Sequence, residues 1–318
     1  MTRSSSRPLV VLEPTMVSPA IRALDRVLQA VAPKNVTVTF VGESGSGKEV
    51  MARRLHDLST RRRGPFVPIN CAAIPDALFE SELFGHERGA FTGATERGQG
   101  KIEMAAGGTL FLDEVAEMPL ALQPKLLRFL ETHRFMRVGG TKKVDVDVRV
   151  VLATLRPLEE EVRAGRFRED LYYRIQGITL NVPPLRERRR DIPGLIASFI
   201  AQLSAIHDCV PPRLTRNARA ALVANSWPGN VRQLRNAIEF ITILRAGKAV
   251  RVADLPPGIT QPSVAAAEEP FVIDPTRPLA ETIDLVVDHV VSLEHGNLSR
   301  AARRLGVSIR TLQRRRRA

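Results

Sequence analysis

The chain has 318 residues, of which 44% are hydrophobic, and its formal net charge is +13. This length allows two or three domains with a sizeable core, and no apolar run is long enough to span a bilayer. The polar segment from Met1 to Arg7 lacks a signal-peptide core, and Cys71 and Cys209 have no partner at metal-ligand spacing, so we expect a cytoplasmic protein.

After a short tail, helical and strand patterns alternate. Ser18 and Pro19 are typical first residues of a helix, and the apolar face that follows is formed by Ile21, Leu24, Leu28 and Val31. Strands are predicted at residues 36–41, 66–70, 109–113, 146–154 and 178–182. This alternation predicts an α/β domain with a parallel sheet. After Pro183-Pro184 the pattern is helical throughout.

A glycine-rich segment lies between the first predicted strand and the next helix. Such loops turn backbone amides towards phosphates, and the helix N-terminus adds partial positive charge. Lys48 is placed to reach the β- and γ-phosphates, whereas Glu49 stands where the general pattern has Ser or Thr. A simple tight turn is the alternative. The residues expected to bind ATP are Gly42, Glu43, Ser44, Gly45, Ser46, Gly47, Lys48 and Glu49.

Two acids end the apolar strand that is predicted at residues 109–113. In a P-loop ATPase the first acid, here Asp113, helps to hold Mg²⁺, and the second, here Glu114, polarises the attacking water. Solvated acids at a strand end are the alternative. With the phosphate loop upstream, the pair predicts ATP and Mg²⁺ as cofactors.

Between these segments lies a six-residue loop, Gly89, Ala90, Phe91, Thr92, Gly93 and Ala94. No periodic pattern predicts burial of Phe91, and an exposed aromatic side chain indicates a contact surface. The loop and the two flanking segments resemble the bacterial enhancer-binding proteins, AAA+ activators of sigma-54 RNA polymerase. The resemblance covers the chain from about Val17 onward and implies that all six residues face sigma-54, with Phe91 and Thr92 in contact positions. A loop folded back on its own domain is the alternative.

The resemblance also implies roles for isolated polar residues. Asn70 matches an asparagine that restrains Glu114 until the partner engages, although a strand-end hydrogen bond is an equal alternative. Arg168 and Arg174 match arginines that reach the γ-phosphate of a neighbouring subunit, so hydrolysis would require a homo-oligomeric ring, a hexamer as in the family. Arg232 matches the arginine by which a helical lid senses nucleotide. Asn230 is expected to cap the helix that carries it.

Leu155 departs from the family pattern, whereas an acid at the position of Glu49 is usual there. The family has Asn or His where Leu155 stands, and that side chain senses the γ-phosphate. Leucine can neither donate nor accept a hydrogen bond, and Arg156 is a partial substitute at best. This departure puts the coupling of hydrolysis to loop movement in question and favours a slow ATPase.

The C-terminal residues form a predicted helix-turn-helix. A helix at residues 297–305 turns Leu298, Ala301, Ala302 and Leu305 inward, and a turn at Gly306-Val307 follows. The second helix resembles that of Fis-type DNA-binding domains, and from Ser299 onward the chain holds many arginines and no acid. A structural hairpin or a solvated basic tail is the alternative. The residues expected to contact DNA are Ser308, Arg310, Thr311, Gln313 and Arg314.

The expected fold class is α/β, with an AAA+ P-loop parallel-sheet domain, a small α-helical lid domain and a C-terminal helix-turn-helix domain. The expected boundaries are a tail at 1–15, the ATPase subdomain at 16–187, the lid at 188–257, a linker at 258–278 and the DNA-binding domain at 279–318. Since only a short tail precedes the ATPase, we expect either constitutive activity or restraint by a separate regulatory protein.

The sequence therefore predicts an ATP-hydrolysing activator that binds enhancer DNA, forms a ring and remodels the closed complex of the sigma-54 RNA polymerase holoenzyme. The alternative is a DNA-binding co-regulator whose AAA+ module turns nucleotide over poorly within a mixed ring. Leu155 favours this alternative, whereas Lys48, the paired acids, Arg168 and Arg174 oppose it. An unfoldase or helicase loader is disfavoured by the helix-turn-helix and the Phe91 loop.

Overall fold

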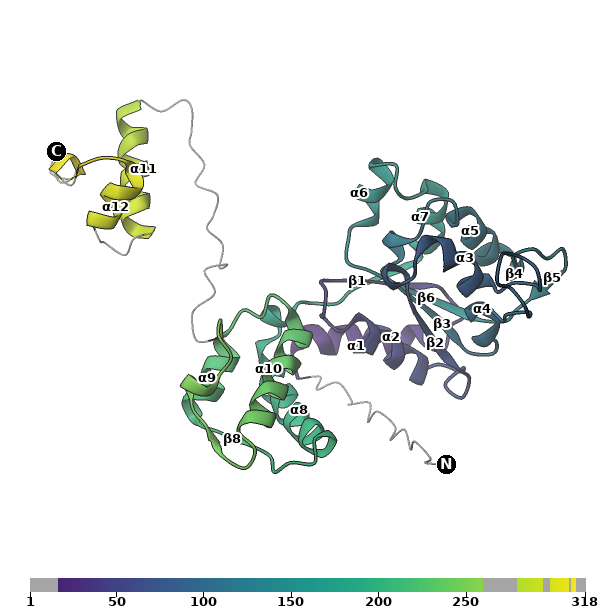
Figure 1. Ribbon diagram of the computed structural model, residues 1–318, viewed down its shortest axis with the longest axis horizontal. Helices are drawn as coiled ribbons and strands as arrows, with labels where there is room; N and C mark the ends of the chain where they lie inside the picture. Colours follow the sequence, from purple (N-terminus) through teal and green to yellow (C-terminus); the bar gives the residue numbers. More distant parts are fainter. Residues whose placement is uncertain (1–16, 260–278, 294–297, 309, 313–318) are drawn as a thin grey trace. The chain divides into compact units, whose positions relative to one another are not determined.

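The computed structural model describes residues 17–259, 279–293, 298–308 and 310–312 (Figure 1). The chain divides after Ser263 into two compact units. The expected linker lies outside the described residues from position 260 onward.

A five-stranded parallel sheet forms the centre of the first unit (Figure 1). Its strands are β1 (Val38–Val41), β2 (Phe66–Asn70), β3 (Thr109–Asp113), β6 (Arg149–Thr154) and β7 (Ile178–Asn181), in the spatial order β2-β3-β6-β1-β7. All five predicted strands are therefore confirmed, although β1 and β6 begin two and three residues later than predicted. Every residue of β6 is buried, as expected for a strand covered on both faces.

Helices cover both faces of this sheet, as Figure 1 shows. They are α1 (Pro19–Val31), α2 (Lys48–Asp57), α3 (Asp76–Phe84), α4 (Lys101–Met104), α5 (Gln123–Thr132), α6 (Leu158–Arg163) and α7 (Glu169–Ile175). Ser18 caps α1 by accepting a hydrogen bond from the Ile21 amide, and Pro19 is the first helical residue, both as predicted.

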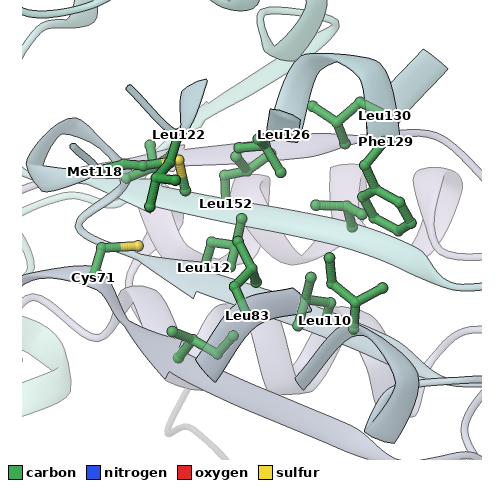
Figure 2. Close-up of a cluster of buried hydrophobic side chains, with 14 of the residues drawn as sticks. Cys71, Leu83, Leu110, Leu112, Met118, Leu122, Leu126, Phe129, Leu130 and Leu152 are labelled. Atoms are coloured by element: carbon green, nitrogen blue, oxygen red, sulfur yellow. The ribbon is translucent and has the colours of Figure 1, made fainter. Parts of the chain in front are cut away.

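Alternate strand residues point into two separate cores. Leu110, Leu112 and Leu152 pack with side chains of α3 and α5 (Figure 2). Phe111 and Val151 pack on the other face with α1 and α2. This alternation is the period of two of a β-strand, and it holds the ends of β1, β3 and β6 in a fixed register.

Short strands outside the main sheet were not predicted. The hairpin of β4 (Arg134–Met136) and β5 (Lys143–Asp145) is largely exposed and lacks an apolar run. The lid holds α8 (Ile192–Ile206), α9 (Arg216–Ala224) and α10 (Asn230–Leu244) around a core of its own. It also holds β8 (Arg213–Leu214) paired with β9 (Ala249–Val250), so the all-helical prediction is wrong there: these two-residue strands are too short to give a periodic signal.

The second unit contains α11 (Leu279–Leu293), α12 (Leu298–Leu305) and a helical stretch at residues 310–312. Ala301 and Ala302 are buried against Val287, Val291 and Leu312. Gly306 has a φ of 68°, which allows the sharp turn, and the Thr311 amide donates to Ser308 Oγ at 3.1 Å. The predicted turn is thus confirmed, and Ser308 caps the helical stretch that follows it.

Candidate nucleotide-binding site and exposed loop

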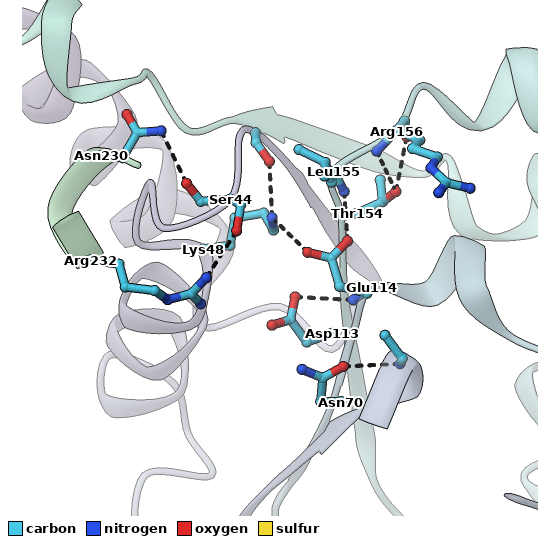
Figure 3. Close-up of polar contacts among 12 residues, drawn as sticks. Ser44, Lys48, Asn70, Asp113, Glu114, Thr154, Leu155, Arg156, Asn230 and Arg232 are labelled. Carbon is cyan, nitrogen blue, oxygen red and sulfur yellow. Dashed lines mark hydrogen bonds and ion pairs between the residues drawn. The ribbon is translucent and has the colours of Figure 1, made fainter. Parts of the chain in front are cut away.

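The phosphate loop joins β1 to α2 at the carboxyl edge of the sheet. Gly45 and Gly47 have φ values of 71° and 103°, and a Cβ on Gly42 would lie 2.8 Å from the Val182 carbonyl oxygen. Glycine is thus required for the conformation at two positions and for close packing at the third. Lys48 begins α2 and is buried, and its Nζ donates to the Gly42 carbonyl at 2.9 Å (Figure 3).

The paired acids at the end of β3 face this loop. Glu114 Oε1 lies 3.2 Å from Lys48 Nζ, and Glu114 Oε2 accepts a 3.0 Å hydrogen bond from the Leu155 amide (Figure 3). Burial, and then the negative charge of Glu114, raise the pKa of the Asp113 carboxyl. Glu114 has a φ of 54°, a left-handed conformation that is costly for this residue type and concentrates at functional sites.

These residues fit a phosphate chain with Mg²⁺. The hydroxyl of Ser46 is buried and has no hydrogen-bond partner within the described residues, and buried hydroxyls of this kind normally have one. The described residues contain no cluster of three or more His, Cys, Asp or Glu that could hold a metal alone. Asp113 would therefore contribute one carboxylate to an ion held mainly by phosphate and water, which is the usual mode for Mg²⁺.

Asn70 lies beside Asp113 in the register of β2 and β3. Its Oδ1 accepts a 3.0 Å hydrogen bond from the Ala72 amide and so caps the short 3-10 helix at Cys71–Ala73. Within the described residues Asn70 makes no hydrogen bond to Glu114. The strand-end bond named above as the alternative is therefore present, and the restraining role stays a prediction.

The two arginines near α7 make contacts away from the phosphate loop. Arg168 pairs with Asp170 through two hydrogen bonds of 3.0 and 2.7 Å. Arg174 donates to the Leu130 carbonyl at 2.8 Å and lines a cavity of about 360 Å³ with Thr37 and Ile178. The last two residues lie at the amino ends of β1 and β7, whereas the phosphate loop lies at the carboxyl ends. The fold therefore does not bring Arg174 to the phosphate loop of its own chain.

The lid contacts the phosphate loop through the start of α10. Arg232 Nη1 donates to Ser44 Oγ at 2.9 Å, and the Val231 amide donates to the Gly45 carbonyl at 3.0 Å. The predicted sensing residue thus reaches the loop.

Asn230 has a larger role than the sequence indicated. It does not cap α10, whose N-cap is Gly229. Its side chain is fully buried and donates to the Ser44 carbonyl at 3.1 Å (Figure 3). It also donates to Glu43 Oε2 at 3.0 Å and accepts from the Leu185 amide at 2.7 Å. No local pattern signals these contacts, because the partners are about 45 and 190 residues distant in the sequence.

Glu43 joins the same junction. Arg186 forms two hydrogen bonds of 2.6 and 2.8 Å with its carboxylate. These bonds, followed by the one from Asn230, lower the pKa of Glu43 from 4.5 to about 2. Glu43 is therefore an anion at neutral pH that ties the loop to the lid, and Arg186 is a functional candidate that the sequence analysis missed.

The loop with Phe91 lies between α3 and α4 and is closed at its base. The Gly89 amide donates to the Ala94 carbonyl at 2.8 Å. Phe91 is 42% exposed, and its ring centroid lies 5.0 Å from that of His86. The expected exposure is confirmed, and the ring also contacts its own domain, which was the alternative.

A buried cation holds the base of this loop. Arg137 lies next to β4 and contacts Glu87 at 2.8 Å and Glu103 at 2.6 Å. A Cβ on Gly139 would lie 2.8 Å from the Cβ of Ala90, so the turn of the β4–β5 hairpin packs against the loop. The hairpin that the sequence analysis missed is thus the support of the loop.

In the second unit, three of the expected DNA contacts, Ser308, Arg310 and Thr311, are exposed. The hydroxyls of Ser308 and Thr311 lie 2.7 Å apart. Gln313 and Arg314 lie outside the described residues.

Three family models match consecutive parts of the chain. A sigma-54 interaction domain matches residues 15–181, an AAA+ ATPase lid domain matches residues 186–270, and a bacterial regulatory protein of the Fis family matches residues 293–318. In the part of the chain that the structure describes, no helix has the length and apolar character needed to cross a membrane.

Curated relatives and solved structures agree with these matches. The chain is 45% identical over 295 residues to the transcriptional regulatory protein ZraR of Klebsiella oxytoca, covering 93% of this chain and 66% of the relative. It is 44% identical over 324 residues to the transcriptional regulatory protein FlbD of Caulobacter vibrioides, covering 96% and 69%. The crystal structure of NtrX from Brucella abortus in complex with ATP is similar with a TM-score of 0.70 at 39% identity, covering 94% of this chain and 67% of that one. The chain thus spans about two thirds of the length of these relatives.

Proposed function

The chain belongs to the family of sigma-54-dependent transcriptional regulators, and we propose that it is an activator that hydrolyses ATP to remodel the closed complex of sigma-54 RNA polymerase. It would bind enhancer DNA through the second unit, assemble into a homo-oligomeric ring in the cytoplasm and act on sigma-54 through the Phe91 loop. The observation that carries the proposal is Glu114, held between Lys48 and the end of β6 beside the phosphate loop.

The proposed chemistry assigns one task to each residue of the site. Amides of the phosphate loop and Lys48 would hold the phosphates, and Asp113 would hold Mg²⁺. ATP bound with Mg²⁺ supplies the phosphoanhydride bond that is broken. Glu114, a carboxylate within reach of the same space, orients the attacking water and accepts its proton.

The arginines are proposed to act between subunits. Arg174 lies at the sheet edge opposite the phosphate loop, so its guanidinium is free to act on a neighbouring subunit rather than on its own site, and Arg168 is the N-cap of the same helix. A ring, hexameric as the resemblance implies, would then be a catalytic requirement. We retain the domain boundaries at 187/188, 257/258 and 278/279 as part of this proposal.

A co-regulator with weak turnover in a mixed ring is the second candidate, and Leu155 is the observation that favours it. Mg²⁺-dependent ATP hydrolysis, measured against protein concentration with Lys48→Ala as control, separates the two. We expect specific activity to rise with concentration in the native chain and to stay at background in Lys48→Ala. Background turnover of the native chain at all concentrations would favour the co-regulator.

The sigma-54 step has its own test. Phe91→Ala removes an exposed ring and leaves the site at β3 untouched, so ATP hydrolysis should be retained while open-complex formation by sigma-54 polymerase is lost. Thr95→Ala, an exposed change just beyond the loop, is the matched control. Open-complex formation at the native rate by Phe91→Ala would contradict the assignment of this loop.

A further inference from the structure

A buried arginine outside the phosphate loop contacts its main chain. Arg188 is 7% exposed, and its Nη2 donates to the Ser46 carbonyl oxygen. A Cβ on Gly47 would lie 3.9 Å from the same nitrogen, which places the guanidinium directly against the loop. Arg188 Nε is buried without a hydrogen-bond partner among the described residues. Burying a cation costs free energy, so the position of Arg188 beside the loop indicates a role there.

The contact fixes the direction of one loop amide. In a planar trans peptide the carbonyl and the following N–H point in opposite directions. Because the Ser46 carbonyl points at Arg188, the Gly47 N–H points away from it. Inward-pointing amides of this segment are the groups by which a phosphate loop binds an anion.

Asp191 links the same turn to the start of α1. It belongs to the 3-10 helix at Arg189–Asp191, and its amide donates to the Arg188 carbonyl at 2.9 Å. Its carboxylate is 1% exposed and accepts from the Val17 and Ser18 amides at 3.0 and 2.7 Å and from the Ser18 hydroxyl at 2.9 Å. Three donors thus converge on one buried carboxylate, from residues 173 and 174 positions away in the sequence.

We propose that Arg188 is a positioning residue for the phosphate loop, and that Asp191 couples its placement to Val17 and Ser18 at the entrance of α1. A displacement of this entrance from Asp191 would shift the turn that carries Arg188, release the Ser46 carbonyl and weaken nucleotide binding. The inference rests on the proposed nucleotide-binding function and goes beyond it by naming an input to the site.

The first test compares Arg188→Gln with Arg190→Gln, an exposed arginine of the same turn. Arg188→Gln should weaken ADP binding by the full chain roughly tenfold, which is the usual effect of losing a hydrogen bond to a charged group. Without nucleotide, it should also raise amide hydrogen exchange in residues 42–48 several-fold. Arg190→Gln should change neither quantity. Fluorescence of Trp227, the single tryptophan, checks that the variants are folded. If Arg188→Gln is not folded, Arg188→Lys is measured in its place.

The second test concerns the coupling. Ser18→Ala removes one bond to Asp191 and the cap of α1, so exchange in residues 42–48 should rise and ADP affinity should fall about threefold. Thr215→Ala is the matched control, because Thr215 caps α9 in the same way away from the phosphate loop. Equal effects of the two variants would overturn the coupling.

The outcomes separate this inference from the function on which it rests. If the native chain binds ADP no better than Lys48→Ala does, the proposed function fails, and the positioning role fails with it. If the native chain binds ADP and Arg188→Gln matches it in affinity and in exchange, only the inference is overturned.

Discussion

The main-chain amide of Leu155 donates a hydrogen bond of 3.0 Å to Glu114 Oε2. The leucine side chain at this position is 43% exposed and has no polar atom. The end of β6 therefore contacts the proposed catalytic carboxylate through a main-chain N–H, a group that every residue except proline has. Leucine thus lacks the polar side chain that the resemblance implies at this position, while the main-chain hydrogen bond to Glu114 is present.

Shortening Leu155 should accordingly have little effect. We expect Leu155→Ala to keep ATP turnover within about threefold of the native rate, because the hydrogen-bonding group is unchanged. Glu114→Gln, which removes the proton acceptor, should lower turnover by about 10² or more while ADP still binds. Steady-state phosphate release at saturating ATP measures both. A tenfold loss in Leu155→Ala would show that the side chain itself is required.

The position of Arg174 predicts complementation between two inactive variants. Lys48→Ala has a defective phosphate loop and keeps Arg174, whereas Arg174→Ala keeps the phosphate loop and lacks the arginine. If Arg174 acts on a neighbouring subunit, mixed rings contain some sites with both groups, and an equimolar mixture should recover a substantial fraction of the turnover. Doubly substituted protein mixed with Arg174→Ala is the control, since no site can then be complete. Equal activity of the two mixtures would argue against action in trans.

The sequence alone was sufficient to predict those parts of the fold and site that consist of consecutive residues. The strands β2 and β3 have the bounds predicted, because buried parallel strands are continuous apolar runs, and the phosphate loop, the paired acids and the Phe91 loop are short consecutive strings. The exposure of Phe91 followed from the same local pattern.

Contacts between remote segments were beyond prediction. Asn230, Arg186 and Arg188 each reach the phosphate loop across more than 140 residues, and nothing in their immediate surroundings distinguishes them from a cap or a surface charge. The β4–β5 hairpin was missed because most of its residues are exposed and only Phe135 is buried in the core, so its strands lack the apolar run of a central strand. Burial patterns alone carry no signal for such elements.

Asn230 should be important for stability as well as for the site. Asn230→Ala leaves the buried Leu185 amide without its acceptor and places alanine at a φ of 52°. Together these effects should lower the free energy of unfolding by about 2–4 kcal/mol. Asn230→Gly removes the same hydrogen bonds, but glycine adopts the left-handed backbone conformation without strain. Its free energy of unfolding should therefore fall by about 1 kcal/mol less than that of Asn230→Ala. Urea unfolding followed by Trp227 fluorescence measures both, and equal losses would assign the whole effect to the side chain.

The exposed Arg310 predicts a change in the salt dependence of DNA binding. If it contacts a phosphate, Arg310→Ala should reduce the slope of log K against log salt by about 0.9 on any duplex. Arg219→Ala, an exposed change on the lid, should leave the slope unchanged. If the loss is confined to one DNA sequence, with the slope unaltered, Arg310 contacts bases instead.

The low pKa of Glu43 predicts how acid affects the junction of loop and lid. Hydrogen bonds from Arg186 and Asn230 lower this pKa from 4.5 to about 2, so the folded state releases the proton more readily than the unfolded state does. The stabilisation of the folded state by the Glu43 carboxylate is therefore fully present above pH 4.5 and is lost as the pH falls towards 2. Glu43→Gln cannot titrate at this position, so it should have a lower free energy of unfolding than the native chain at neutral pH. This difference should be constant from pH 7 to about 5.5 and should be smaller at pH 3.5, where the native chain has lost part of the stabilisation. Urea unfolding followed by Trp227 fluorescence at each pH supplies the comparison. Arg186→Gln should show the same shrinking deficit, since it removes the main cause of the shift. A deficit that stays constant in both variants would mean that Arg186 and Asn230 do not hold the Glu43 carboxylate in solution.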